Sequence, residues 1–219
     1  MRNDIVLFDF DGVIGNTWPD QFEWIKHITK KMKVPFSCKT LAEFRYHYIE
    51  PYQNYYKKIG IDFDTKKDEV LKEFLKFREE RQPPMVTGMY QVIDTLHNQG
   101  LKLGIATNAR ESDLMNHLNR YGLVSHFDAI VCANENKKIK QKPEPDTLQE
   151  ALRQLEHKDE QVYFVGDTSI DIIAAREAGV RSVAAYFEES CYNTLERLKE
   201  EEPEYIIFKP SELLSILKR

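Results

Sequence analysis

The chain has 219 residues, of which 42% are hydrophobic and 31% are charged, so it can form one large domain or a main domain that carries a smaller one. A net charge of -5 argues against a broad nucleic-acid surface, and no apolar run approaches the roughly 20 residues of a membrane span. The three cysteines are scattered, which argues against a disulfide framework. The opening residues, MRNDIVLFDF, favour a strand over a signal peptide, so we expect a cytoplasmic protein.

Short runs of mostly apolar residues predict β-strands, and their near-continuous hydrophobicity is typical of strands covered on both faces. From residue 88 onward these runs alternate with helical patterns. Such alternation predicts an α/β fold with a doubly wound parallel sheet. The strands are expected at residues 5–10, 101–107, 127–133, 161–167, 180–186 and 204–208, and the helices at 88–100, 110–122, 145–155 and 169–179.

Residues 16–83 follow a different pattern because they contain no strand-like run. Amphipathic stretches at 18–33, 40–60 and 65–82 predict consecutive helices, and Pro83 and Pro84 close the region. We therefore expect a core domain made of residues 1–15 and 84–219. A small all-helical domain of residues 16–83 is inserted into it after the first strand.

Polar and charged side chains follow four of the predicted strands. Any one of them alone is weak evidence, because an aspartate or threonine after a strand is usually a turn or helix-cap residue. Ligands of open α/β sheets bind at the carboxyl ends of the strands, so several such residues at one edge predict a site there. They are Asp9 and Asp11 after the first strand, Thr107 and Asn108 after the second, Lys142 after the third, and Asp167 and Asp171 after the fourth.

Four motifs at these strand ends resemble the motifs of the haloacid dehalogenase (HAD) superfamily, whose members are mostly phosphotransferases. They are DFDGV, IATN, the lysine of KPEPD, and GDTSID, in that order. The resemblance covers nearly the whole chain and implies a Rossmann-like core. The helical insertion resembles the cap domain of the phosphoglycolate-phosphatase and β-phosphoglucomutase branch, which implies a role in substrate specificity.

The resemblance also implies catalytic roles. Asp9 corresponds to the nucleophile that forms an aspartyl-phosphate, and Asp11 to the general acid and base. Gly12 lets the chain turn tightly beside the phosphate. Thr107 and the backbone at Asn108 correspond to donors of hydrogen bonds to the phosphoryl oxygens.

Charge and metal binding follow from the same resemblance. Lys142 corresponds to the residue that neutralises phosphoryl charge. Asp167 corresponds to a Mg²⁺ ligand, together with a carboxylate oxygen of Asp9 and the main-chain carbonyl of Asp11. Asp171 corresponds to an outer support for the metal or the lysine.

Charge counting supports the need for a cation. Asp9, Asp167 and Asp171 carry three negative charges and a phosphate ester about two more, whereas Lys142 returns only one. A unit pair 4 Å apart is worth about 4 kcal/mol at an effective dielectric constant near 20. Mg²⁺ suits carboxylates combined with a substrate phosphate, so we expect it as the cofactor.

The sequence thus predicts a Mg²⁺-dependent phosphatase that hydrolyses a small phosphomonoester through a phospho-aspartate on Asp9. One alternative is a phosphomutase, which passes the phosphoryl group to a sugar. Another is a non-catalytic regulator that accepts phosphate on Asp9. The expected partner is a small phosphorylated metabolite, and we expect neither nucleic acid nor a membrane as a partner. The protein itself is expected to be a monomer or a homodimer.

Overall fold

The computed structural model describes residues 4–79, 81–133 and 138–217. The chain divides into two compact units. One, the core unit, is made of Met1–Asn16 and Met85–Arg219, and the other, the helical unit, of Thr17–Pro84. Within the described ranges, no helix combines the length and the apolar character that crossing a membrane requires.

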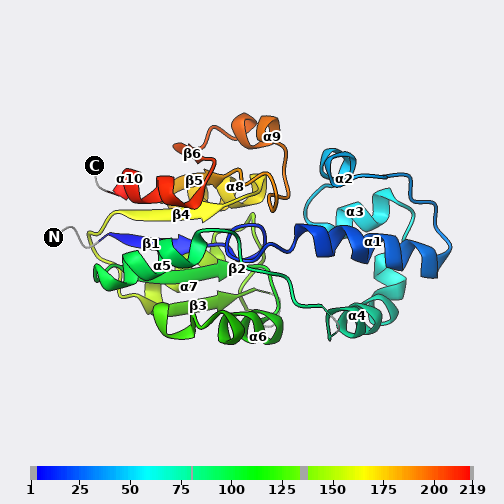
Figure 1. Cartoon of the computed structure of the whole chain (residues 1–219), viewed down its shortest axis with the longest axis horizontal. Helices are drawn as coiled ribbons and strands as arrows, with labels where there is room; N and C mark the ends of the chain where they lie inside the picture. Colours follow the sequence, from blue (N-terminus) through cyan, green and yellow to red (C-terminus); the bar gives the residue numbers. More distant parts are fainter. Residues whose placement is uncertain (1–3, 80, 134–137, 218–219) are drawn as a thin grey trace. The chain divides into compact units, whose positions relative to one another are not determined.

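The core unit contains a six-stranded sheet in which every neighbouring pair is parallel, as predicted. The strand order is β3-β2-β1-β4-β5-β6, so β1 lies in the middle of the sheet (Figure 1). Phe8 at the end of β1 is level with Ile105 of β2 and Val165 of β4. The strands are β1 (Ile5–Phe8), β2 (Lys102–Thr107), β3 (Ala129–Cys132), β4 (Val162–Gly166), β5 (Arg181–Ala185) and β6 (Tyr205–Ile207).

Helices cover both faces of the sheet because successive side chains of a strand point to opposite faces. Val6 and Phe8 of β1 join an apolar cluster with α5, α6 and α10, whereas Ile5 and Leu7 join a second cluster with α7 and α8. The helices are α5 (Met89–Asn98), α6 (Glu111–Tyr121), α7 (Asp146–Gln154), α8 (Ser169–Ala178), α9 (Leu195–Glu200) and α10 (Leu213–Leu217). The doubly wound fold predicted from the sequence is confirmed.

The helical unit consists of α1 (Trp18–Met32), α2 (Leu41–His47), α3 (Tyr52–Lys58) and α4 (Phe63–Glu79), packed around aromatic side chains. Trp18 stacks on Phe44 with ring centroids 4.5 Å apart. The prediction of a single helix over residues 40–60 was wrong, since α2 and α3 are separate. Pro51 lies directly before α3. Proline lacks a backbone N–H and disfavours the helical conformation of the residue before it, which explains the break.

Candidate active site

Asp9 and Asp167 follow two adjacent strands at the carboxyl edge of the sheet. The backbone N–H of Asp9 donates to the carbonyl of Val165 at 2.8 Å, so the chain just beyond β1 still runs beside β4. Since β2 lies on the other side of β1, Thr107 at its end belongs to the same edge. The sheet order therefore brings Asp9 together with residues that lie about 100 and about 160 positions further along the chain.

Lys142 places a buried cation at this edge. Its side chain is only 1% exposed, and its Nζ lies 2.8 Å from Oδ1 of Asp9 and 2.6 Å from Oδ1 of Asp171. The same ammonium donates to the carbonyl of Ala106 at 3.2 Å. Burial alone would lower the pKa of Lys142, but the charges of Asp171 and Asp9 raise it above its usual range. Its two acidic partners thus favour the charged form of Lys142, which contacts Asp9.

Asp9 is buried together with two other acids. Burial raises the pKa of the Asp9 carboxyl to about 6, against the lowering effect of Lys142 and with further raising by Asp171 and Asp11. One carboxylate oxygen each from Asp9, Asp167 and Asp171 lies within 4.8 Å of the others, and all three residues are buried. Oxygen donors packed this closely match the preference of a hard divalent cation such as Mg²⁺.

The three acids of this cluster are held in different ways. Asp167 accepts the backbone N–H of Tyr192 on Oδ2 at 2.6 Å. Asp171 accepts the backbone N–H of Thr168 at 3.1 Å and its hydroxyl at 2.5 Å, both on Oδ2, while Oδ1 faces Lys142. Asp171 therefore supports the lysine and caps the start of α8. In the described part of the chain, the carboxylate of Asp11 is not a member of the cluster.

Gly12 packs directly against the cluster. Its φ of +77° lies in the left-handed region, and a Cβ atom built on it would fall 2.2 Å from Oδ2 of Asp167. The loop is closed by hydrogen bonds from Gly12 N–H to the carbonyl of Gly15 and from Gly15 N–H to that of Phe10, each 2.9 Å. Only glycine fits both the backbone conformation and the space at this position.

Asn108 contacts Lys142 in a manner that the sequence did not indicate. Its Oδ1 accepts the backbone N–H of Lys142 at 2.9 Å, and its Nδ2 donates to the carbonyl of Lys142 at 3.2 Å. The side chain of Asn108 thereby positions the backbone of the lysine. The preceding Thr107 is buried, and its hydroxyl oxygen accepts the N–H of Ala109 at 3.2 Å.

The segment between β5 and α9 also reaches this edge, and sequence analysis missed it. Ser190 donates its hydroxyl to the carbonyl of Gly12 at 2.7 Å. The thiol of Cys191 contacts the carbonyl of Asp167 at 3.3 Å. Asn193 accepts the backbone N–H of Ser169, the first residue of α8, at 3.2 Å. Serine and asparagine are ordinary loop residues, so no motif or periodicity points to them.

Comparison with known proteins assigns the class to which this fold and site belong. Residues 6–185 match the family model described as haloacid dehalogenase-like hydrolase, and the chain belongs to that family. The resemblance noted from the motifs is thus confirmed, and so is the expectation of a hydrolase.

Particular relatives extend over the full length of the chain. The chain is 30% identical to pyrophosphatase PpaX of Bacillus mycoides over 223 residues, which cover 100% of this chain and 99% of the relative. A predicted phosphatase from Clostridium acetobutylicum has a similar structure, with a TM-score of 0.83, 20% identity and 100% coverage of both chains. A predicted phosphoglycolate phosphatase from Haemophilus somnus has a TM-score of 0.80, 20% identity and 99% coverage of both.

Proposed function

We propose that this protein is a Mg²⁺-dependent phosphatase that hydrolyses a small phosphomonoester through a phospho-aspartate on Asp9. The observation that carries the proposal is the buried contact between Lys142 and Asp9 within a cluster of three acids. A buried charge is costly unless it is paired or used, and this cluster holds more negative than positive charge. A site that binds both a cation and an anion accounts for that arrangement.

In the first half-reaction, a carboxylate oxygen of Asp9 attacks phosphorus, and the bond from phosphorus to the ester oxygen breaks. Asp11 donates a proton to the leaving oxygen. In the second, water attacks the aspartyl-phosphate while Asp11 accepts its proton, and the bond between phosphorus and Asp9 breaks to release phosphate. Thr107 and the backbone at Asn108 hold the phosphoryl oxygens, and Lys142 offsets their charge.

The donor set fits Mg²⁺, which Asp9, Asp167 and the main-chain carbonyl of Asp11 would hold. When bound, the ion supplies positive charge that offsets the repulsion between the acids and the phosphoryl oxygens. Asp171 stays in its outer role, because its two oxygens are engaged by Lys142 and Thr168.

The helical unit has a separate role in this proposal. The proposal keeps the division predicted from the sequence, in which residues 1–15 and 84–219 form the catalytic core and residues 16–83 form a cap that selects the substrate. A helical domain inserted into the chain directly after a catalytic loop can exclude water during the first half-reaction. The substrate class proposed is a small phosphorylated metabolite.

The test is a screen of phosphorylated metabolites with Mg²⁺, comparing the unsubstituted protein with Asp9→Asn. Inorganic pyrophosphate belongs in the panel because the Bacillus mycoides relative is named a pyrophosphatase. We expect phosphate release by the unsubstituted protein and none by Asp9→Asn. Asp94→Asn is the matched control, since that carboxylate is 41% exposed and contacts His126 instead. Hydrolysis retained by Asp9→Asn would exclude Asp9 as the nucleophile.

The same screen separates the two alternatives. A phosphomutase would isomerise a sugar phosphate with little phosphate release. A phospho-accepting regulator would hold a stable acyl-phosphate on Asp9 without turnover of any metabolite. Either result would replace the phosphatase proposal.

A further inference from the structure

We infer that Ser190–Asn193, here called the clamp segment, positions the nucleophile loop (Asp9–Gly15) and Asp167 for metal binding. This inference deepens the proposed function and rests on it. The clamp segment lies between β5 and α9, far along the chain from β1 (Figure 1). It contacts the site through its backbone and side chains alike, at Gly12 of the nucleophile loop, at Asp167 and at Ser169 of α8.

The first contact is that of Ser190 with the nucleophile loop. Ser190 is completely buried, and its hydroxyl donates to the carbonyl of Gly12 at 2.7 Å. Gly12 directly follows Asp11 and forms the tight turn of the loop. Because a buried carbonyl that loses its donor is costly, the hydroxyl of Ser190 favours one position of this turn. Ser190 thus acts on the turn beside Asp11 and is a positioning residue.

The second set of contacts holds Asp167. The backbone N–H of Tyr192 donates to Oδ2 of Asp167 at 2.6 Å, and the thiol of Cys191 contacts the carbonyl of Asp167 at 3.3 Å. Tyr192 therefore holds the side chain of Asp167. The thiol of Cys191 contacts the main chain of the same acid and also lies 3.2 Å from the carbonyl of Asn193. An acid held in this way presents its remaining oxygen in a defined direction, which is how outer partners tune a metal site.

The third contact ties the clamp segment to α8. Asn193 is buried, and its Oδ1 accepts the backbone N–H of Ser169 at 3.2 Å. Since α8 carries Asp171, the same four residues link the nucleophile loop, Asp167 and the helix that supports Lys142. A shift of the clamp segment would be transmitted to all three.

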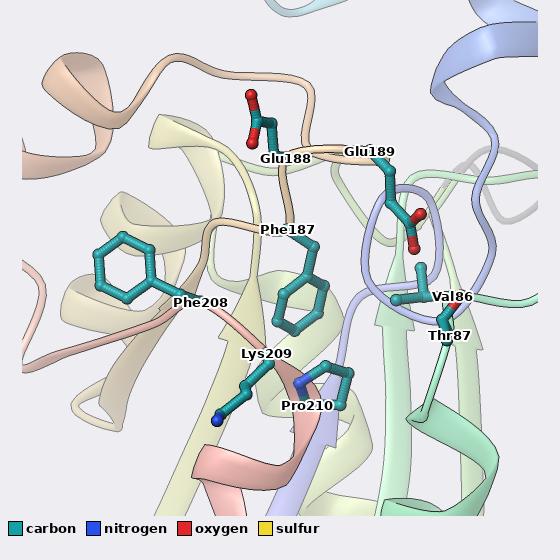
Figure 2. A pocket seen from close by; sticks show the side chains of 8 residues that line it. All are labelled: Val86, Thr87, Phe187, Glu188, Glu189, Phe208, Lys209 and Pro210. Atoms are coloured by element: carbon teal, nitrogen blue, oxygen red, sulfur yellow. The ribbon is translucent and has the colours of Figure 1, made fainter.

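An open pocket lies beside the clamp segment. The residues just before it, Phe187, Glu188 and Glu189, line a cavity of about 440 Å³ (Figure 2). Across this cavity lies Val86, whose backbone N–H donates to the carbonyl of Ile14 at 2.9 Å. Both walls are therefore tied to the nucleophile loop. Phe187 itself is buried in the apolar cluster of the core unit, so packing and hydrogen bonds act together at this end of the segment.

The experiment compares Ser190→Ala with Thr29→Val. Thr29 is a matched control because its buried hydroxyl also donates to a main-chain carbonyl at 2.7 Å, that of Ile25 in the helical unit. In metal-free protein, hydrogen exchange of the peptide spanning residues 9–15 should become faster in Ser190→Ala and stay unchanged in Thr29→Val. Calorimetric titration with Mg²⁺ alone should give a dissociation constant about tenfold higher for Ser190→Ala and unchanged for the control.

Kinetics then distinguish positioning from substrate contact. On any phosphoester that the unsubstituted protein hydrolyses, Ser190→Ala should lower kcat about tenfold and leave KM within about twofold. Asn193→Ala is a second variant and should change Mg²⁺ affinity in the same direction. The inference is overturned by unchanged exchange and Mg²⁺ affinity in Ser190→Ala, or by a rise in KM alone. Absence of phosphoester turnover in the unsubstituted protein overturns the proposed function, while exchange and calorimetry still decide the inference.

Discussion

Replacing Lys142 with methionine removes the only cation that contacts Asp9 among the ion pairs of the described residues. The methionine keeps a long apolar stem of similar size, so the change chiefly deletes the charge. Two buried carboxylates, Asp9 and Asp171, would then face each other without compensation. The carbonyl of Ala106 would also lose its hydrogen bond from the ammonium.

The size of the effect follows from the distances. At 2.8 Å and 2.6 Å, and with an effective dielectric constant of about 20, each ion pair has a gross attraction of about 6 kcal/mol. The cost of burying the charges offsets most of this, and loss of one partner of a buried pair lowers stability by about 3–5 kcal/mol. We expect Lys142→Met to lose that much free energy of unfolding without divalent cations. Mg²⁺ should restore part of it, because it supplies replacement positive charge.

The assay is urea denaturation in EDTA and in Mg²⁺, together with phosphate release. Turnover of Lys142→Met should fall by a factor of about 10²–10³, as when a charge-stabilising donor is removed from an active site. Lys140→Met is the control, because the Lys140 side chain is 68% exposed and its contact with Glu144 is 3.7 Å long. The reasoning is refuted if Lys142→Met in EDTA is as stable as Lys140→Met, or if it retains most of its turnover.

Three further outcomes are expected. Gly12→Ala and Gly100→Ala both place an alanine at a positive φ, which costs about 1–2 kcal/mol of stability. Only Gly12→Ala also places a Cβ against Asp167, so calorimetry should show weaker Mg²⁺ binding for this variant alone. Equal Mg²⁺ affinities of the two variants would contradict this. Asn108→Ala loses both hydrogen bonds to the backbone of Lys142. Its kcat, measured by phosphate release, should fall about tenfold, and its stability, measured by urea denaturation, should fall by about 1–2 kcal/mol. An unchanged kcat would show that Lys142 needs no such support. In metal-free protein, the raised pKa of Asp9 means that its contribution to stability is present below about pH 4 and is lost as the pH rises through about 6. Denaturation curves of Asp9→Asn across this range should lack that decrease, and an identical pH profile in both proteins would count against it.

Much of the fold could be predicted because it depends on local patterns. Val6 and Phe8 alternate with Ile5 and Leu7, and both sets are apolar, so β1 had to be covered on both faces. The boundaries of all six predicted strands agree with the structure to within two residues at either end. The prediction of one helix over residues 40–60 was wrong because helical periodicity continues on both sides of Pro51, whereas the proline itself interrupts the helix.

Some features of the candidate site could likewise be predicted from local sequence, and others could not. The sequence by itself determined which acids and which lysine follow the strands, and Gly12 could be singled out because it comes directly after two of those acids. Only the tertiary structure decided that Lys142 lies between Asp9 and Asp171, that Asn108 holds its backbone, and that Ser190 reaches Gly12. The physical reason is that strand and turn formation depend on neighbours in the chain, whereas hydrogen bonds between residues as distant as Gly12 and Ser190 depend on strand order and loop path, which leave no local pattern.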